Sequence, residues 1–270
     1  MDLKKTYIPQ KGFTKLCEIG KCSLHMLEFG ILELGPGESY IFDTQENEAA
    51  FIILGGRCSV KTDRVEWKNL GTRRSVFEGM ATSFYLGRRT KAEITTDWNV
   101  KIAVALSPVE EDTEPFTVMP DQVRMVRLGQ KPWERDTTFI FDGSTPTKRF
   151  CIGEAYVTPG NWAGFPPHKH DVDHMPSEGV LEEIYYYLFQ PEQGFGIQYC
   201  YTKDGEIDVA YPVKNNDLVE FPKGYHTTVT APGYNSYFLW LMAGDNKGFY
   251  RSNDPDHEWV SAVENLLKKQ

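Results

Sequence analysis

The sequence has few cysteines and no long apolar run, and both absences limit what kind of protein it encodes. Its five cysteines are scattered, their number is odd, and none stands in a Cys-x-x-Cys pair. This pattern is unlike a disulfide framework and is typical of a reducing compartment. No apolar segment approaches the ~18 residues of a membrane-spanning helix. Residues 1–7 lack the apolar core of a secretory signal. We therefore expect a soluble, cytoplasmic protein without a membrane partner.

Positive charge is also scarce. The chain carries 29 Lys and Arg against 38 Asp and Glu, a formal net charge of −9. Binding to nucleic acid needs clustered Lys and Arg to neutralise phosphates. The one basic cluster, residues 88–91, is short and is interpreted as a solvated loop. These observations exclude nucleic acid as an expected partner.

Helical periodicity is absent from most of the chain, and short strand-like segments take its place. Segments such as residues 49–54 and 184–189 are rich in β-branched and aromatic residues, and turns with glycine or proline separate them. This pattern predicts an all-β sandwich or barrel. One helix is expected near the C-terminus, where apolar residues from Trp259 to Leu267 recur at helical spacing and Asp256 can cap the first turn.

The two halves of the sequence repeat the same order of features. Each half has a strand, a Pro-Gly turn, a second apolar strand, a glycine turn and a further strand that ends in a glycine corner. Such an order indicates a duplicated unit. We therefore predict two tandem β-barrels, residues 1–130 and residues 131–270.

Three histidines in the second half have the spacing of metal ligands. His168 and His170 are separated by one residue, so both side chains project from the same face of a strand. Glu183 begins a strand-like run of aromatic residues, and His226 follows a Pro-Lys-Gly-Tyr corner. Three imidazoles and one carboxylate suit a divalent Zn, Mn, Fe, Co or Ni ion. The alternative is that these are unrelated surface or core histidines, and their order in a β-rich chain argues against it.

The first half has no histidine at the corresponding positions. Residues 43–48 stand where the repeat would place the histidine pair, and the glycine corner at residues 86–89 reads Leu-Gly-Arg-Arg. We therefore predict one divalent metal ion per chain, held by the second barrel. The first barrel is expected to be structural or part of an interface.

These residues resemble the two motifs of the cupin family, which are His-x-His with a later Glu, and Pro-x-Gly-x-His. A larger set of segments is similar to the 5-deoxy-glucuronate isomerase family of myo-inositol catabolism, to which the 5-keto-4-deoxyuronate isomerases are related. The similar segments are residues 74–79, 159–162, 166–171, 181–187, 193–196, 224–226, 231–234 and 242–244. The resemblance implies two tandem cupin barrels of the double-stranded β-helix or jelly-roll type.

The resemblance also implies the ligand set His168, His170, Glu183 and His226. A long insertion separates the second histidine from the glutamate, and the isomerase family has one too. Glu183 is therefore preferred as the ligand over Glu178 or Glu182.

The activity that the resemblance implies is a metal-dependent aldose–ketose isomerisation, an intramolecular oxidoreduction. The expected substrate is a small deoxy-uronate, most closely 5-deoxy-D-glucuronate going to 5-dehydro-2-deoxy-D-gluconate. Three alternatives fit the same ligands: a 5-keto-4-deoxyuronate isomerase, an oxygen-activating cupin dioxygenase and a non-enzymatic sugar-binding cupin. Exposed barrel faces suggest a homo-oligomer.

Candidate catalytic residues are Tyr185, Tyr187 and Glu178. In a strand the two tyrosines share the face of Glu183, so either can line a cavity and act as an acid or hold a sugar hydroxyl. Glu178 lies in the insertion and can act as a proton shuttle. The competing interpretations are core tyrosines and a solvated acidic loop.

Candidate substrate-binding residues are Gln198, Tyr201 and Lys223, for which a solvent-facing amide, a barrel-wall tyrosine and an exposed turn lysine are the competing interpretations. The family commonly has arginine where this chain has Leu188 and Tyr199. Because arginine is suited to binding a carboxylate in a bidentate manner, these two replacements predict a different carboxylate anchor or a substrate without a carboxylate.

Overall fold

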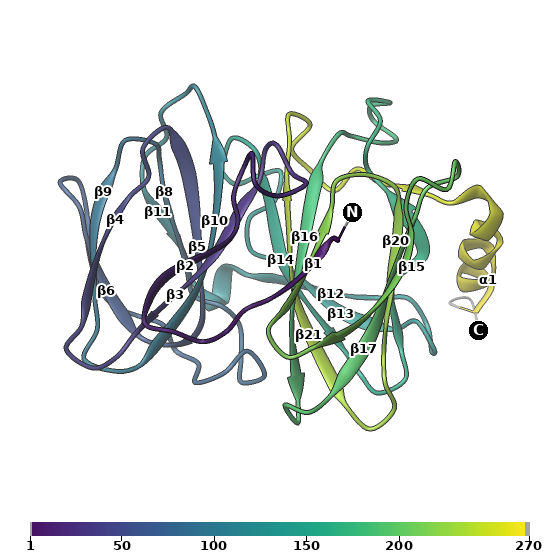
Figure 1. Cartoon of the computed structure of the whole chain (residues 1–270), viewed down its shortest axis with the longest axis horizontal. Helices are drawn as coiled ribbons and strands as arrows, with labels where there is room; N and C mark the ends of the chain where they lie inside the picture. Colours follow the sequence, from purple (N-terminus) through teal and green to yellow (C-terminus); the bar gives the residue numbers. More distant parts are fainter. Residues whose placement is uncertain (1, 268–270) are drawn as a thin grey trace. The chain divides into compact units, whose positions relative to one another are not determined.

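The computed structural model describes residues 2–267, and its regular secondary structure is almost entirely β-strand (Figure 1). Among these residues there is one α-helix, α1 (Trp259–Leu267), and there are two short 3-10 helices, η1 (Pro120–Gln122) and η2 (Pro255–His257). The all-β prediction is confirmed. None of the described helices has the length and apolar character that crossing a lipid bilayer requires.

The strands form two compact units that interleave along the chain. The N-terminal unit comprises Ile8–Arg124 and Ile140–Cys151. The C-terminal unit comprises the residues up to Tyr7, Met125–Phe139 and the chain from Ile152 onward. The predicted division at residue 130 differs from this one in three places. It assigns residues 1–7 and 125–130 to the N-terminal half, and residues 140–151 to the C-terminal half.

The N-terminal unit packs a six-stranded and a four-stranded sheet around one core. Phe51 of the larger sheet meets Phe42 of the smaller one at a ring-centroid distance of 5.0 Å, so the apolar core lies between the sheets. In spatial order the six strands are β11 (Phe116–Val118), β8 (Ser83–Leu86), β5 (Asn47–Gly56), β10 (Val100–Pro108), β3 (Glu28–Leu34) and β2 (Gly12–Cys17). The four strands are β4 (Ser39–Asp43), β9 (Lys91–Thr95), β6 (Cys58–Lys61) and β7 (Glu66–Leu70).

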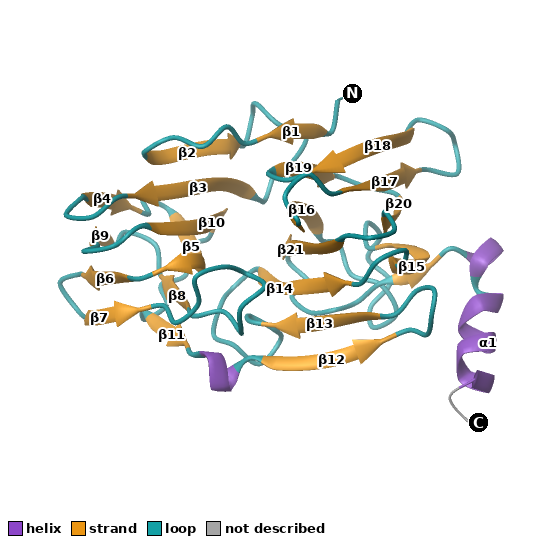
Figure 2. Ribbon diagram, turned by 90° about the horizontal axis from the view of Figure 1, so that it is seen from below, coloured by secondary structure: helices purple, strands orange, loops and turns teal. Residues whose placement is uncertain are grey.

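The C-terminal unit has a seven-stranded and a five-stranded sheet. The seven strands are β1 (Lys4–Thr6), β19 (Asp217–Phe221), β16 (Glu182–Gln190), β21 (Asn235–Ala243), β14 (Phe150–Val157), β13 (Arg135–Phe139) and β12 (Arg124–Leu128). The five strands are β18 (Asp208–Lys214), β17 (Phe195–Tyr201), β20 (Tyr225–Thr230), β15 (Trp162–Lys169) and β22 (Ser252–Asn253). Figure 2 shows β14, β13 and β12 as neighbours. The two sheets pack face to face, so the side chains on their inner faces form the core of this unit.

The first strand of the chain belongs to the C-terminal unit. β1 pairs antiparallel with β19, with Lys4 opposite Val219, and the Lys5 ammonium lies 2.6 Å from the Glu220 carboxylate. The flanking Leu3 and Tyr7 are each 1% exposed. Backbone pairing and burial together fix this segment at the edge of the seven-stranded sheet.

Two local expectations are corrected. Cys17 and Cys22 form a disulfide, with Cα atoms 5.5 Å apart, which the scattered cysteine pattern did not predict. Asp256, the expected cap of the C-terminal helix, lies inside the preceding 3-10 helix η2, whose N-cap Asp254 accepts a hydrogen bond from the Asp256 backbone N–H at 3.0 Å.

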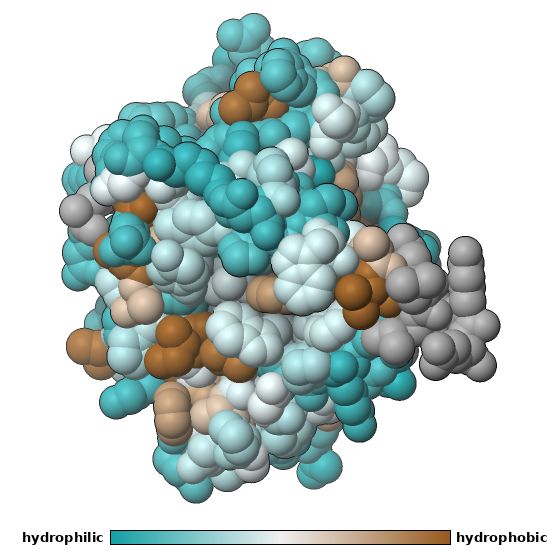
Figure 3. Space-filling model, turned by 90° about the vertical axis from the view of Figure 1, so that its right-hand side faces the viewer, coloured by the Kyte–Doolittle hydropathy of each residue, from teal (hydrophilic) through white to brown (hydrophobic). Residues whose placement is uncertain are grey.

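Figure 3 shows part of the surface of the C-terminal unit. Hydrophobic groups form separate spots there, divided by hydrophilic residues. The exposed large hydrophobic residues of this unit include Met125, Val172 and Trp259. These spots identify no particular interface, so the expected homo-oligomer stays a prediction.

Candidate metal centre

Three histidines and one glutamate converge between the two sheets of the C-terminal unit. His168 and His226 come from β15 and β20, His170 follows β15, and Glu183 lies on β16 of the opposite sheet. One ring nitrogen of each histidine lies within 4.8 Å of those of the other two. The Glu183 Oε2 atom is 3.0 Å from both His170 Nε2 and His226 Nε2. The three histidines therefore form a cluster that could hold a metal ion.

Strand register explains why these residues meet. His168 is the direct cross-strand partner of His226, and Glu183 is the partner of Phe221. The Phe221 ring stacks on the His226 imidazole at a centroid distance of 4.4 Å. All four polar side chains are at most 4% exposed. The apolar surroundings hold the rings in place and exclude solvent from the cluster.

Backbone carbonyls orient two of the imidazoles. His168 Nδ1 lies 3.2 Å from the Gly164 oxygen, and His170 Nδ1 lies 2.7 Å from the Leu181 oxygen. Donation from Nδ1–H to a carbonyl leaves the other ring nitrogen, Nε2, with a free lone pair. This is the arrangement that histidine ligands use in metal sites.

The directions of the pKa shifts indicate which members of the cluster carry a charge. Burial alone would raise the pKa of Glu183, but the hydrogen bond with His170 and the nearby His226 side chain outweigh it and lower that pKa. Burial lowers the pKa of His168 and of His226. Burial acts the same way on His170, yet the hydrogen bond to Glu183 is stronger and raises its pKa. Without an ion, Glu183 is thus an anion and His170 is the imidazole that holds a proton most readily.

A divalent cation fits this donor set. Both ring nitrogens of His226 lack a well-aligned hydrogen-bond partner among the described residues, although the residue is only 1% exposed. A buried polar atom without a partner costs about 1–3 kcal/mol. A cation bound by His226 Nε2 would remove that cost at one of the two atoms, and three nitrogens with one carboxylate oxygen suit a borderline-soft ion.

The cluster opens into a cavity within the C-terminal unit. Among the predicted residues His168, His170, Glu183 and Tyr185 line it, and apolar side chains from β21 form much of the remaining wall. These apolar residues are Phe238, Trp240 and Met242. The cavity adjoins the cluster, so a ligand bound at the cluster would extend along these walls.

Comparison with known proteins identifies the relatives of this chain. A model described as the KduI/IolB family matches residues 6–260. The chain belongs to the KduI/IolB family. A 5-deoxy-glucuronate isomerase of Bacillus licheniformis is 36% identical over 239 residues, which is 88% of each chain. The 5-deoxy-glucuronate isomerase of Bacillus subtilis strain 168 gives the same identity and the same coverage.

Solved structures place this KduI/IolB family member in the cupin fold. An IolB-like protein from Salmonella typhimurium LT2 has a TM-score of 0.92 at 30% identity, covering 97% of this chain and 100% of that one. An oxalate decarboxylase of Lactobacillus farciminis, solved as a formate complex, has a TM-score of 0.69 at 9% identity, covering 100% and 93%. The second likeness concerns the fold alone. The predicted architecture of two tandem cupin barrels is confirmed.

The structure brings only one of the three predicted catalytic residues to the cavity of this family member. Tyr185 lines it, and its ring centroid is 5.7 Å from that of His226. The Tyr187 hydroxyl instead donates a 2.6 Å hydrogen bond to Gln198 Oε1. The Glu178 carboxylate accepts hydrogen bonds from Lys169 Nζ at 2.6 Å and from two backbone N–H groups. Because these contacts occupy Tyr187 and Glu178, their placement does not support their predicted roles.

The predicted substrate-binding residues lie outside the cavity lining. Gln198 is fully buried, and its amide nitrogen donates to the Thr227 carbonyl at 2.8 Å. The Tyr201 hydroxyl donates to Asp254. Lys223 is a turn residue whose ammonium lies 2.5 Å from the Glu206 carboxylate. Each of these side chains has a structural partner that accounts for its position.

Sequence reasoning missed two arginines that line the cavity, Arg135 and Arg251. Arg135 begins β13, and Arg251 precedes β22. Neither lies near the histidine motifs in sequence, and pairing between strands brings them there. From the sequence one could expect only that an anionic substrate needs a cationic side chain somewhere in the C-terminal unit.

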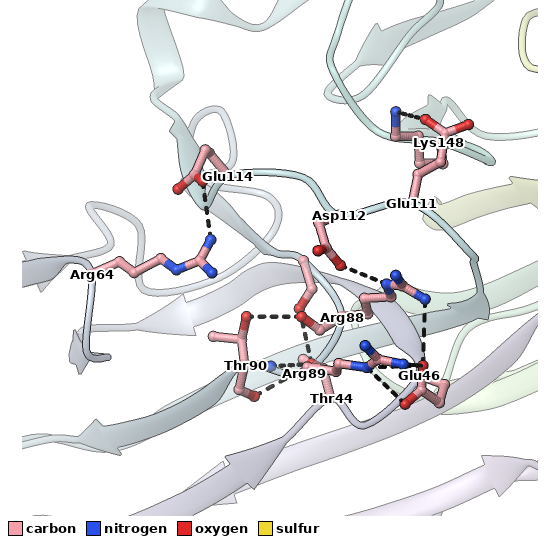
Figure 4. Close-up of polar contacts among 11 residues, drawn as sticks. Thr44, Glu46, Arg64, Arg88, Arg89, Thr90, Glu111, Asp112, Glu114 and Lys148 are labelled. Carbon is pink, nitrogen blue, oxygen red and sulfur yellow. Dashed lines mark hydrogen bonds and ion pairs between the residues drawn. The ribbon is translucent and has the colours of Figure 1, made fainter.

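The basic cluster of the N-terminal unit is neutralised by acids. Arg88 Nε lies 2.6 Å from Asp112, and Arg89 Nε lies 2.9 Å from Glu46 (Figure 4). These ion pairs lie at the surface of the N-terminal unit. The interpretation of residues 88–91 as a surface loop is consistent with this placement.

Proposed function

We propose that this protein is a metal-dependent isomerase that converts 5-deoxy-D-glucuronate to 5-dehydro-2-deoxy-D-gluconate in inositol catabolism. The observation that carries the proposal is the convergence of His168, His170, Glu183 and His226 beside a cavity. Membership of a family whose relatives include 5-deoxy-glucuronate isomerases supports the substrate. In this reaction the proton on C2 of the aldose moves to C1, and the proton of the C2 hydroxyl moves to the former aldehyde oxygen.

The ligands we propose are the three Nε2 atoms and the Glu183 carboxylate. A divalent ion held there would act as a Lewis acid that stabilises negative charge developing on the sugar oxygens. The carbonyls of Gly164 and Leu181 keep His168 and His170 in the tautomer that leaves Nε2 free. Low exposure of all four side chains keeps water from competing for these atoms.

Tyr185 is the residue we propose for proton donation. Burial, followed by the charge of Glu183, raises the pKa of Tyr185 well above its ordinary value, so the phenol stays protonated. Its hydroxyl forms no hydrogen bond with another residue of the range 2–267 and is therefore available to a ligand in the cavity. A protonated phenol next to the sugar oxygens can donate a hydrogen bond or a proton to them.

Three finer points belong to the same proposal. The ion is one of Zn, Mn, Fe, Co or Ni, which the donor set accommodates. The enzyme is cytoplasmic and homo-oligomeric. Elemental analysis of purified protein identifies the ion, and size-exclusion chromatography with light scattering gives the number of chains.

The deciding experiment is NMR of purified protein incubated with 5-deoxy-D-glucuronate, with and without a chelator. We expect ketose signals without chelator, none with it, and recovery after metal is added back. Absence of ketose from metal-loaded protein would overturn the substrate assignment. Undiminished turnover in fully metal-free protein would overturn the role of the ion. Parallel oxygen-uptake measurement should stay at background, because isomerisation consumes no oxygen.

A further inference from the structure

Two arginines lie in the wall of the same cavity as the candidate metal ligands. Arg135 is 6% exposed and begins β13, which pairs with β14 through Arg135 opposite Val157 (Figure 2). Arg251 lines the cavity from the segment just before β22. Both arginines belong to the C-terminal unit.

Strand register places Arg251 beside the metal cluster. In the pairing of β22 with β15, Asn253 is opposite His168 and Ser252 is opposite Lys169. Continuing this antiparallel register by one residue brings Arg251 next to His170. The charge of Arg251 is also a cause, after burial, of the lowered pKa of His168. The guanidinium thus faces the space where a substrate bound at the cluster would extend.

Neither arginine has an acidic partner. Within residues 2–267, no carboxylate lies at ion-pair distance from Arg135 or Arg251. The Arg135 guanidinium donates a hydrogen bond to the Trp133 carbonyl at 3.3 Å, and the Arg251 guanidinium carbon is 5.0 Å from the Phe249 ring centroid. Arg135 is buried and Arg251 is half-buried. Cations in such positions are ordinarily paired, because losing water without a partner is costly.

The two positive charges also act on each other. Burial first, and then the charge of Arg251, lowers the pKa of Arg135 to about 10. Both guanidinium groups remain cationic at neutral pH. Two carboxylates, Glu183 and Glu264, act on Arg251 through their charge, but each has another partner. Glu183 forms a hydrogen bond with His170, and Glu264 accepts a 3.2 Å hydrogen bond from Trp133 Nε1. The cavity wall therefore carries two positive charges that no neighbouring carboxylate of the described residues pairs with. This local positive charge contrasts with the net charge of −9 of the whole chain.

We infer that Arg135 and Arg251 bind the carboxylate of the sugar acid while the opposite, aldehyde end lies at the metal cluster. This inference rests on the proposed function for the identity of the sugar. Guanidinium groups match a carboxylate with paired N–H donors. It also accounts for Leu188 and Tyr199, where the family commonly has arginine: neither lines the cavity, and the Tyr199 hydroxyl bonds to Asp208 at 3.0 Å. Loss of arginine at these positions leaves the anchor intact.

The experiment measures equilibrium binding to metal-loaded protein by calorimetry. Two probes are used: the substrate acid reduced to an alcohol at C1, which cannot isomerise, and the same polyol with a hydroxymethyl group in place of its carboxylate. The variants are Arg251→Gln, Arg135→Gln and the charge-preserving Arg251→Lys. The matched control is Arg127→Gln, because Arg127 is an exposed arginine of β12 that pairs with Asp136 away from the cavity lining. Bound metal and melting temperature are recorded for every variant.

We expect each Gln variant to bind the acid probe about 10- to 100-fold more weakly, the loss typical of a charge-assisted hydrogen bond. Binding of the hydroxymethyl probe and metal content should not change, Arg251→Lys should recover part of the loss, and Arg127→Gln should match the wild type. Equal weakening of both probes, or no change for the acid, would overturn the inference. If Arg135→Gln does not fold, the Arg251 variants decide alone. Carboxylate-selective binding without turnover of 5-deoxy-D-glucuronate would sink the proposed function and leave this inference standing.

Discussion

His168 of β15 and His226 of β20 are direct cross-strand partners, and their ring centroids lie 4.5 Å apart. The pairing joins the two cupin motifs, which stand far apart in sequence. The backbone register brings these two residues opposite each other. The cluster is thus held by strands that also carry the core of the C-terminal unit.

Removing one member of this pair should empty the site. His226→Ala deletes a nitrogen that has no other well-aligned partner among the described residues. Metal affinity should fall by more than the roughly 10- to 100-fold that loss of an outer-shell partner causes. Elemental analysis and calorimetric titration check this. The control is His174→Ala, an exposed histidine of the insertion, which should keep full occupancy; equal occupancy in both variants would contradict the ligand set.

Metal binding should weaken as the pH falls. Burial lowers the pKa of His170, but its hydrogen bond with Glu183 raises that pKa above the ordinary 6.5. A proton on His170 must leave before its Nε2 can bind an ion, so the affinity is highest above the raised pKa and declines below it. The decline should begin at higher pH than for an unperturbed histidine.

Calorimetric titration of metal-free protein between about pH 6 and pH 8 tests this. In buffers of different ionisation enthalpy, metal uptake near neutral pH should release protons. Proton release that is zero across the range would show that His170 is already neutral, and the prediction would fail.

Tyr185→Phe should impair turnover. Loss of a positioned proton donor typically costs about 100-fold or more in kcat. Metal content should be unchanged, since the phenol is not among the ligands. The matched control is Tyr201→Phe, whose hydroxyl donates to Asp254 outside the cavity lining. That control should lower stability by about 1 kcal/mol and leave kcat and KM near wild type. A kcat for Tyr185→Phe equal to that of the control would remove Tyr185 from the mechanism.

Glu48 should matter for folding of the N-terminal unit without affecting the metal. Its buried carboxylate accepts hydrogen bonds from the Tyr85 hydroxyl at 2.8 Å and from the Lys148 and Arg149 backbone N–H groups at 2.7 Å. Glu48→Ala removes the acceptor for these buried donors and should cost about 2–5 kcal/mol of unfolding free energy.

Denaturant unfolding measures that cost. Glu46→Ala is the comparison, because Glu46 forms solvent-exposed ion pairs with Arg88 and Arg89 (Figure 4) that are worth at most about 1 kcal/mol. Similar losses in the two variants would show that the buried carboxylate has no special role.

The fold class and the convergence of the three histidines could be predicted from the sequence because both follow local patterns. Alternation of side chains along a strand put His168 and His170 on one face. The same rule put Tyr185 and Tyr187 on the face of Glu183, yet the Tyr187 hydroxyl turns to Gln198 on a strand of the other sheet. Which side chains a neighbouring strand offers depends on register, and a single sequence does not reveal register.

The same limit explains the missed arginines and the interleaved units. Arg251 reaches the cavity through pairing of a two-residue strand, β22, with β15. Residues 4–6 join the C-terminal unit through edge pairing with β19, which uses backbone groups that nearly every residue possesses. The pattern of side chains along the sequence therefore predicts neither of these strand pairings.

The position of β1 has a consequence for how the protein is made. Lys4 and Asp217, whose side chains meet at 3.2 Å, are separated by 213 residues. A ribosome therefore releases the edge strand long before its partner exists, and the seven-stranded sheet is completed only when most of the polypeptide has emerged. Until then β1 has no partner strand. In a chain shortened at its N-terminus the edge of β19 would stay uncovered after synthesis, which should favour association between chains.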